Sequence, residues 1–160
     1  MNLITKYPNI TVACVVPKDN KFLFVRENSD GAIVYNQPAG HLKQNETLIE
    51  AAKRETLEET AWQVEITHFL EIYQYASISD DVCYVEHSFV AEPKMYKKDV
   101  KLDADITGTY WLTIDEAAKL SDEMRSPLVL KTLTDYMAGN LYSLKILHPE
   151  LESSSRLSDE

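Results

Sequence analysis

Three glutamates at helical spacing are the residues of this sequence best suited to chemistry. Glu55, Glu58 and Glu59 stand at positions i, i+3 and i+4, so in a helix their carboxylates converge on one face within about one turn. Carboxylates held that close repel one another, and cations must offset the repulsion. Arg54 supplies one positive charge beside them, and divalent cations would supply more. The pattern therefore indicates a catalytic metal site.

The chemistry that such a site favours is hydrolysis at phosphorus. Oxygen ligands without histidine or cysteine favour Mg²⁺, with Mn²⁺ as a substitute, over zinc. These ions bind phosphate oxygens, neutralise the charge of a di- or triphosphate and activate water for attack. A carboxylate of the cluster could position or deprotonate that water. Gly40, upstream of the cluster, allows a tight backbone turn in which a carbonyl could also face a metal.

The same residues also fit a plain solvated helix face. Helices rich in Glu and Lys most often cover a surface, and the i,i+4 pair of Glu50 and Arg54 contributes only about 0.3–0.5 kcal/mol. On helical spacing alone, metal binding is the less frequent of the two readings. Evidence from a longer stretch of sequence must separate them.

The helix that presents the cluster is predicted to begin after the polar stretch that ends at Asn45 and Glu46. Hydrophobic residues recur at helical spacing within it. They can form one apolar face next to the glutamates, made of Leu48, Ala51, Ala52 and Leu57.

Strands are predicted on both sides of this helix. Residues 10–16 and 21–26 are apolar runs joined by turn formers at 17–20, which is typical of a β-hairpin. A short segment then leads to Gly40. After the helix, β-branched and aromatic residues predict strands at 63–75, 82–92 and 109–112.

Two more helices are predicted near the end of the chain. Thr113 and Glu116 have the spacing of a capping box, which starts the first. Ser126 is a favourable N-cap with Pro127 in the first helical position, and Gly139 can end that helix. Strands, a helix, strands and then helices suit an α+β fold better than regular βαβ winding.

Length and charge limit the classes of protein that this chain can belong to. A chain of 160 residues with 44% hydrophobic residues predicts one domain, over residues 1–147, and the polar composition of 148–160 predicts a flexible tail. The net charge of −10 disfavours nucleic acid and anionic membranes as partners. No run approaches the ~20 apolar residues of a membrane span, so we expect a cytoplasmic protein. Cys14 and Cys83 lie in apolar runs, as reduced thiols do.

A longer pattern resembles a known family. A glycine, a glutamate, an Arg-Glu pair and a Glu-Glu pair stand at the fixed spacing of the Nudix hydrolase signature, on Gly40, Glu46, Arg54, Glu55, Glu58 and Glu59. Thr56 stands where the family has an aliphatic residue, and Ala61 stands where it has glycine. Both departures concern packing and the helix exit, and they leave every charged position intact.

The resemblance implies a fold and a set of roles. The fold is an α/β/α sandwich around a mixed β-sheet, with the signature forming a loop-helix-loop. Glu55 and Glu59 would be the Mg²⁺ ligands, Glu58 would assist them, and Arg54 would orient them. The general base varies in position between members of the family, so its identity stays open.

A narrower likeness, to one bacterial phosphatase of the family, extends over most of the chain. The strings that carry it include residues 11–16, 36–42 and 125–129. It implies hydrolysis of nucleoside tri- and diphosphates, of thiamine pyrophosphate and of its hydroxymethylpyrimidine pyrophosphate precursor, with release of orthophosphate. The partner would be a small di- or triphosphate, and the protein a monomer or weak homodimer. The alternatives are a Nudix enzyme for another diphosphate, such as a nucleotide sugar or dinucleotide, or a non-catalytic ligand sensor.

Substrate contacts outside the signature rest on residue type alone. Tyr35 could stack on a base or pyrimidine ring, although an aromatic residue beside a strand is more often part of the core. Arg26 and Arg125 could bind phosphate oxygens, since a planar guanidinium suits them. His41 follows the signature glycine and could approach the site, and Asp105 is a candidate for an extra base or metal ligand.

Overall fold

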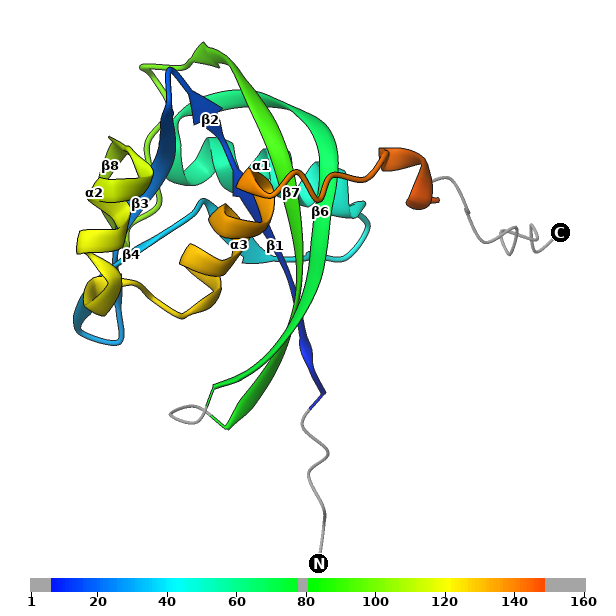
Figure 1. Ribbon diagram of the computed structural model, residues 1–160, viewed down its shortest axis with the longest axis horizontal. Helices are drawn as coiled ribbons and strands as arrows, with labels where there is room; N and C mark the ends of the chain where they lie inside the picture. The colour runs from blue at the N-terminus through cyan, green and yellow to red at the C-terminus, as the bar shows by residue number, and fades with distance from the viewer. Residues whose placement is uncertain (1–6, 78–80, 149–160) are drawn as a thin grey trace, which may run out of the picture.

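The computed structural model describes residues 7–77 and 81–148 (Figure 1). Two sheets, three α-helices and two short 3₁₀ helices make up these ranges. In chain order the elements are β1 (Asn9–Val15), β2 (Pro17–Lys18), β3 (Lys21–Ser29), β4 (Ala32–Asn36), β5 (Ala39–His41), α1 (Leu48–Thr60), β6 (Trp62–Ser77), β7 (Val82–Tyr96), β8 (Ile106–Leu112), α2 (Ile114–Lys119), η1 (Ser121–Glu123), α3 (Leu128–Met137) and η2 (Leu144–Ile146).

The central sheet is mixed and has the strand order β5-β1-β7-β6. β1 runs parallel to β7 and antiparallel to β5, while β6 and β7 pair antiparallel along most of their length. Residues 12–16 of β1 and just beyond it are all buried, on both faces of the strand. A strand that is buried on both faces needs a covering layer on each side.

The second sheet joins β2, β3 and β4, with β8 on the other edge of β3. The predicted hairpin of residues 10–16 and 21–26 is wrong for most of its length, because β1 and β3 belong to different sheets. Both edges of β1 are already hydrogen-bonded to β5 and β7. The hairpin that forms is shorter: Pro17 and Lys18, which were predicted as part of the turn, pair with the start of β3.

Helices cover the central sheet on both faces (Figure 1). Ala51 and Ala52 of α1 pack with Val12 and Cys14 in one apolar cluster. Val15 points the other way and packs in a second cluster, which contains residues of α2 and α3. Because alternate residues of β1 enter opposite clusters, the sheet lies between two helical layers. The α/β/α sandwich with a mixed sheet is confirmed.

Of the two departures from the Nudix pattern, Thr56 lies inside α1 and Ala61 lies at its C-terminal end. Thr47 and Glu50 form a capping box at its start. Thr56 is buried, but its hydroxyl donates to the carbonyl of Ala52 at 2.8 Å, so it packs like an aliphatic residue without an unpaired polar atom. Ala61 ends the helix in the left-handed conformation, with a φ of 60°. In this conformation the Cβ of alanine clashes with the backbone at a cost of about 1–2 kcal/mol, which a glycine would avoid.

The later helices begin close to their predicted starts. The Thr113–Glu116 capping box is present at α2. The helix predicted to begin with Pro127 starts one residue later, at Leu128, whose N–H donates to the Ser126 hydroxyl at 3.3 Å. Gly139 follows the helix with a φ of 79°.

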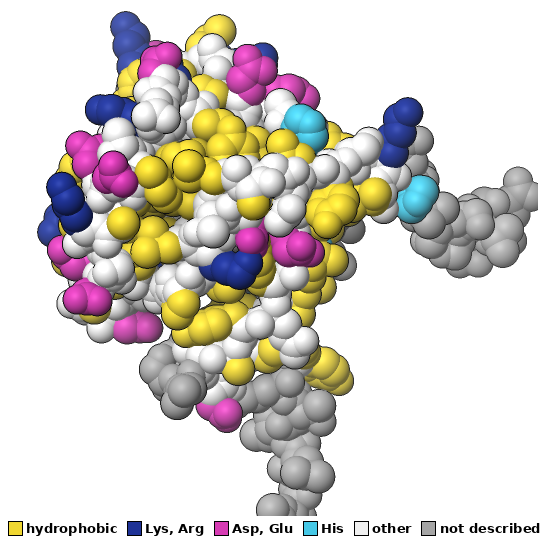
Figure 2. Space-filling model, in the orientation of Figure 1, with side chains coloured by type: hydrophobic (Ala, Val, Ile, Leu, Met, Phe, Trp, Pro, Cys, Tyr) yellow, Lys and Arg dark blue, Asp and Glu magenta, His cyan; other side chains and the backbone are white. Residues whose placement is uncertain are grey.

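Charged side chains are spread over the surface. Figure 2 shows acidic and basic groups interspersed on one face, with hydrophobic side chains between them. Cys14 and Cys83 are both free, as predicted. Within the described ranges, every helix falls short of the length and apolar character that a membrane span requires. Of the predicted tail, residues 149–160 lie outside the described residues.

Candidate active site

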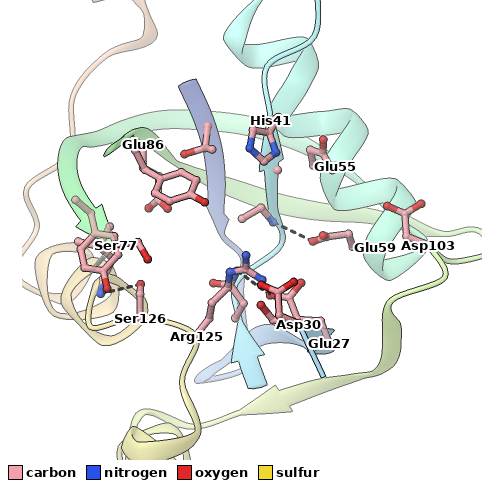
Figure 3. Close-up of a pocket in the computed structure, with 18 of the residues that line it drawn as sticks. Glu27, Asp30, His41, Glu55, Glu59, Ser77, Glu86, Asp103, Arg125 and Ser126 are labelled. Carbon is pink, nitrogen blue, oxygen red and sulfur yellow. Dashed lines mark hydrogen bonds and ion pairs between the residues drawn. The ribbon is translucent and has the colours of Figure 1, made fainter. Parts of the chain in front are cut away.

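A cavity of about 750 Å³ lies where β5, the glutamate-bearing side of α1 and the long strands β6 and β7 meet (Figure 3). Its floor is set by β5, whose Ala39 and Gly40 line it. The segment before β5 is held in place by Gln37, which is buried and donates to the Val129 carbonyl at 2.7 Å and the Thr132 hydroxyl at 2.6 Å. The fold therefore fixes β5 against α3 as well as against α1.

Arg54 joins the signature residues into one network. Its Nε and Nη2 donate to the two carboxylate oxygens of Glu46, at 2.8 and 2.7 Å. Its Nη1 reaches Glu55 at 2.5 Å and Glu58 at 3.1 Å. Nη2 also donates to the carbonyl of His41 at 3.0 Å, which ties α1 to β5. The arginine thus positions two glutamates of the helix and the strand that faces them.

The charge of Arg54 is reflected in the pKa values of its partners. Hydrogen bonds from Arg54 lower the pKa of Glu46 to about 2, so this carboxylate stays ionised at every physiological pH. Glu55 is buried, and burial raises its pKa, although the bond from Arg54 acts in the opposite direction. Glu46 is therefore a permanently charged partner of Arg54. The negative charge of Glu55 is only partly compensated by Arg54, so a further cation would stabilise it.

Glu59 lies deepest in the cluster. It is 7% exposed, and its Oε2 accepts the N–H of Ala39 at 2.9 Å. Burial raises its pKa to about 9, and the nearby carboxylates of Glu27, Glu55 and Asp103 add to the shift. Without a cation, this side chain keeps its proton at neutral pH.

The sequence did not single out Asp103, which completes the cluster. A carboxylate oxygen from each of Glu55, Glu58 and Asp103 lies within 4.8 Å of the other two. The N–H of Asp103 donates to the carbonyl of Glu58 at 3.1 Å, so the loop before β8 docks on the helix. Asp105, which the sequence suggested as an extra base or metal ligand, lines a second, smaller hollow instead. Its backbone carbonyl accepts the N–H of Asn28.

Glycine is required at position 40 because β5 and the Glu55 side chain of α1 lie close together there, and not because the chain turns. The predicted tight turn at this position is wrong, since Gly40 lies in β5 and pairs with Val12 of β1. A Cβ built on Gly40 would overlap the carboxyl group of Glu55. Only glycine lets strand and helix come together with that carboxyl between them.

The structure separates the residues proposed for substrate contact. Arg125 lines the cavity and pairs with Glu27 at 3.1 Å. Tyr35 packs edge-on against Tyr110, with ring centroids 5.8 Å apart, and is not among the residues that line the cavity. Arg26, in the middle of β3, is also absent from the lining.

Other groups that the sequence did not indicate line the cavity as well. Its second basic group is Lys43, whose Nζ lies 3.9 Å from a carboxylate oxygen of Glu58. Tyr75, Tyr84 and Glu86 form the wall contributed by β6 and β7. His41, which the sequence did suggest near the site, also lines the cavity, with its ring 6.4 Å from that of Tyr84. No spacing rule could have found Tyr75, Tyr84 and Glu86, because the pairing of β6 and β7 brings them to the cavity.

The donor set fits a hard divalent cation. Glu55, Glu58 and Asp103 offer carboxylate oxygens alone, and Glu59 lies outside this triad. Burial raises the pKa of Glu55 and of Glu59, and a bound cation would lower both. We therefore retain Glu55, Glu58 and Glu59 as metal-binding candidates and add Asp103. Gly40 approaches the cluster through its Cα, next to the carboxyl group of Glu55, and its backbone carbonyl stays a predicted ligand.

Replacing Arg54 with lysine is expected to weaken the site without removing its charge. An ammonium cannot make the paired bonds to Glu46 and also reach Glu55 and Glu58. We expect a loss of about tenfold in kcat/KM and a Tm lower by a few degrees. Steady-state kinetics and thermal unfolding measure both, with Lys53→Arg on the exposed side of the helix as the control. Wild-type kinetics in Arg54→Lys would show that the paired geometry is not needed.

Comparisons with known proteins agree with this geometry. The sequence model of the NUDIX domain matches residues 7–133. Phosphatase NudJ of Shigella boydii is 38% identical over 140 residues, which cover 88% of this chain and 90% of that protein. Phosphatase NudJ of Escherichia coli K12 is 37% identical over the same shares. A solved NUDIX hydrolase from Nitrosomonas europaea superimposes with a TM-score of 0.87 at 39% identity, covering 89% of this chain and 97% of that one.

Proposed function

The chain belongs to the Nudix hydrolase family, whose members hydrolyse phosphorus anhydrides, and from this premise we propose that it is a Mg²⁺-dependent phosphohydrolase of nucleoside di- and triphosphates and thiamine-type pyrophosphates. The products would be orthophosphate and the shortened phosphate ester. Mn²⁺ would substitute for Mg²⁺.

One observation carries the proposal. Glu55, Glu58 and Asp103 bring carboxylate oxygens within 4.8 Å of one another at the edge of a cavity of about 750 Å³. Ligand sites for small molecules typically measure about 300–1,000 Å³, so this cavity has room for a nucleotide or a thiamine-sized diphosphate. An acidic cluster can receive an anionic diphosphate only together with cations, and this requirement supports metal-dependent chemistry.

The residues of the chain would divide the work. Glu55, Glu58, Glu59 and Asp103 would hold the metal, and a bound Mg²⁺ would neutralise the diphosphate and acidify water. Arg54 would keep Glu55 and Glu58 in place by its bonds to both. A buried carboxylate of the cluster would take the proton from the attacking water.

Phosphate contacts are assigned to the basic side chains of the cavity. Lys43 lies beside the glutamate helix, with its Nζ 3.9 Å from a carboxylate oxygen of Glu58. Arg125 lies next to Glu27 (Figure 3). Both can donate to phosphate oxygens that the metal leaves free. Of the three substrate contacts that the sequence suggested, we therefore keep Arg125 and replace Tyr35 and Arg26.

The choice of substrates rests on similarity. The relatives named phosphatase NudJ match this chain over 88% of its length. On this basis we propose nucleoside tri- and diphosphates, thiamine pyrophosphate and hydroxymethylpyrimidine pyrophosphate as substrates. We further propose a cytoplasmic monomer or weak homodimer that does not act on nucleic acid, in keeping with the net charge of −10.

The test is the release of orthophosphate and pyrophosphate from four compounds. Thiamine pyrophosphate, its pyrimidine precursor, GTP and ADP-ribose are incubated with the protein and either Mg²⁺ or EDTA. We expect orthophosphate from the first three with Mg²⁺, and a loss of at least about 100-fold with EDTA. ADP-ribose, which has no terminal phosphoanhydride, serves as the control for cleavage inside a diphosphate bridge.

Each other result points to a different function. Pyrophosphate release or a preference for ADP-ribose would assign the chain to another Nudix activity. Full turnover in EDTA would contradict metal dependence. Folded protein that binds Mg²⁺ but turns over none of the four would overturn the proposal in favour of a ligand sensor.

A further inference from the structure

The wall of the cavity opposite the glutamate helix carries a carboxyl group that the proposed reaction does not use. Glu86 of β7 lines the cavity, and Figure 3 shows it on the far side from Glu59 and Asp103. The strand register places it in a row across the sheet, between Thr11 of β1 and Tyr73 of β6. Glu86 thus belongs to the sheet wall and not to the metal cluster.

Glu86 has a hydrogen-bond partner but no cation beside it. The hydroxyl of Ser88, which is fully buried, donates to its Oε1 at 3.0 Å. No ion pair between residues in the described ranges includes Glu86. Burial accordingly raises the pKa of this carboxyl. The bond from Ser88 orients the group and leaves its second oxygen for another donor.

Two tyrosines line the cavity on the same wall as Glu86. Tyr84 precedes Glu86 by two residues on the same strand, so both point to the same face of the sheet. Tyr75 pairs with Tyr84 across the strands, and both tyrosines line the cavity. The ring of Tyr84 also lies 6.4 Å from that of His41. Tyrosine rings next to one oriented carboxyl group suit a planar ring that carries a polar edge.

The two ends of the cavity therefore differ in chemistry. One end gathers the glutamates of α1 with Asp103 and Lys43, where a diphosphate and its cations would bind. The other end presents Tyr75, Tyr84 and Glu86. A substrate that spans both must carry a diphosphate at one end and a planar ring at the other.

We propose that Glu86 is a specificity-determining residue, whose carboxyl oxygen accepts a hydrogen bond from the ring amino group of an aminopyrimidine or aminopurine held beside Tyr75 and Tyr84. An exocyclic amino group suits this position because it donates in the ring plane and carries no charge. A carbonyl at the same ring position has no hydrogen to donate, and its lone pairs would repel those of the carboxyl oxygen. The inference rests on the proposed function for the diphosphate end, and it narrows the substrates to those with an amino-bearing ring.

The test measures binding without turnover. Nucleoside monophosphates contain no phosphoanhydride and are therefore not turned over. Calorimetry with Mg²⁺ can compare CMP and AMP with their deamino analogues, in which hydrogen replaces the 4-amino group of cytosine or the 6-amino group of adenine. In at least one pair we expect wild type to bind the amino nucleotide about fivefold to tenfold more tightly, the effect of one hydrogen bond. The ratio should fall to about one in Glu86→Leu.

Two further variants separate this role from a structural one. In Glu86→Gln the amide oxygen keeps the bond from Ser88 and an NH₂ donor replaces the free carboxyl oxygen, so the preference for the amino nucleotide should be lost or reversed. Glu92→Gln, at an exposed site on the same strand, should match wild type. Equal binding within both pairs by wild type, or a preference that survives in Glu86→Leu, would overturn the inference.

Turnover of CDP and ADP tests the proposed function separately. Hydrolysis of either without any dependence of binding on Glu86 would support the enzyme and overturn the assignment of Glu86. The amino preference without hydrolysis of any diphosphate would support Glu86 and overturn the proposed reaction.

Discussion

Replacing Glu59 with glutamine is expected to lower kcat for phosphoanhydride hydrolysis by about a thousandfold. The amide retains the shape of the side chain and can still accept the N–H of Ala39, which lies 2.9 Å from Oε2 in the wild type. It cannot carry the negative charge that a metal ligand or a base needs. Phosphate release with saturating Mg²⁺ measures the effect.

The same substitution is expected to stabilise the metal-free protein at alkaline pH. Burial raises the pKa of Glu59 from 4.5 to about 9, so between these values the folded state binds the proton that the unfolded state releases. Stability of the wild type therefore falls as pH rises from about 4.5 to 9, and glutamine removes this loss. In EDTA at pH 8 we expect Glu59→Gln to be more stable by at least about 2 kcal/mol.

Denaturant unfolding in EDTA at pH 5 and pH 8 tests this sign. The gap between variant and wild type should be small at pH 5, widen at pH 8, and narrow again when Mg²⁺ is added. Glu123→Gln, at an exposed position, is the matched control and should follow wild type in both assays. A Glu59→Gln protein that is less stable than wild type at pH 8, or that keeps wild-type activity, would contradict the roles given to this residue.

Replacing Gly40 with alanine is expected to reduce kcat/KM by about a hundredfold with a much smaller effect on folding. The added Cβ would overlap the carboxyl group of Glu55, which must then leave its place beside Arg54 in the acidic cluster. That carboxyl is the end of a side chain and can move, so the strand itself can keep its pairing with β1. Kinetics and thermal unfolding measure the two effects.

Gly139→Ala is the matched control for Gly40→Ala. A Cβ at Gly139 meets open space, but φ is 79°, so alanine there costs about 1 kcal/mol of stability far from the cavity. Its kinetics should match wild type. The double variant Gly40→Ala/Glu55→Asp shortens the displaced side chain and should recover part of the lost activity. Wild-type kcat/KM in Gly40→Ala would show that Glu55 need not hold its observed position.

Much of the catalytic helix could be predicted from the sequence because its interactions are local. Glu55, Glu58 and Glu59 share a face through helical geometry alone, and Arg54 and Glu46 follow from the fixed spacing of the signature. The capping box at Thr113 is equally local. The mixed sheet followed from family resemblance, since no local pattern showed that β1 would run parallel to β7.

Predictions that depended on long-range pairing fared less well. Residues 10–16 and 21–26 look like a hairpin because hydrophobic runs flank a turn, but the competing partners of β1 come from β5 and β7. The sequence offers no reason to prefer Asp103 over Asp105 as a neighbour of the glutamates. The hydrogen bond from the Asp103 N–H to the Glu58 carbonyl brings Asp103 to the cluster. In the sequence, Tyr35 and Tyr84 are equally good candidates for stacking on a ring. The strand register of the folded chain places Tyr84 in the cavity wall and Tyr35 outside it.

The sequence by itself determined the family, the glutamate helix and the carboxylate donors that the helix carries, because helix periodicity and signature spacing act within about twenty residues. Only the tertiary structure decided what surrounds that helix. It brought Asp103 to the cluster, turned Gly40 from a presumed turn into a point of close approach, and set Glu86 on the opposite wall. These relations arise from strand pairing and loop docking across the whole chain, whose free energies depend on every competing contact and leave no local pattern.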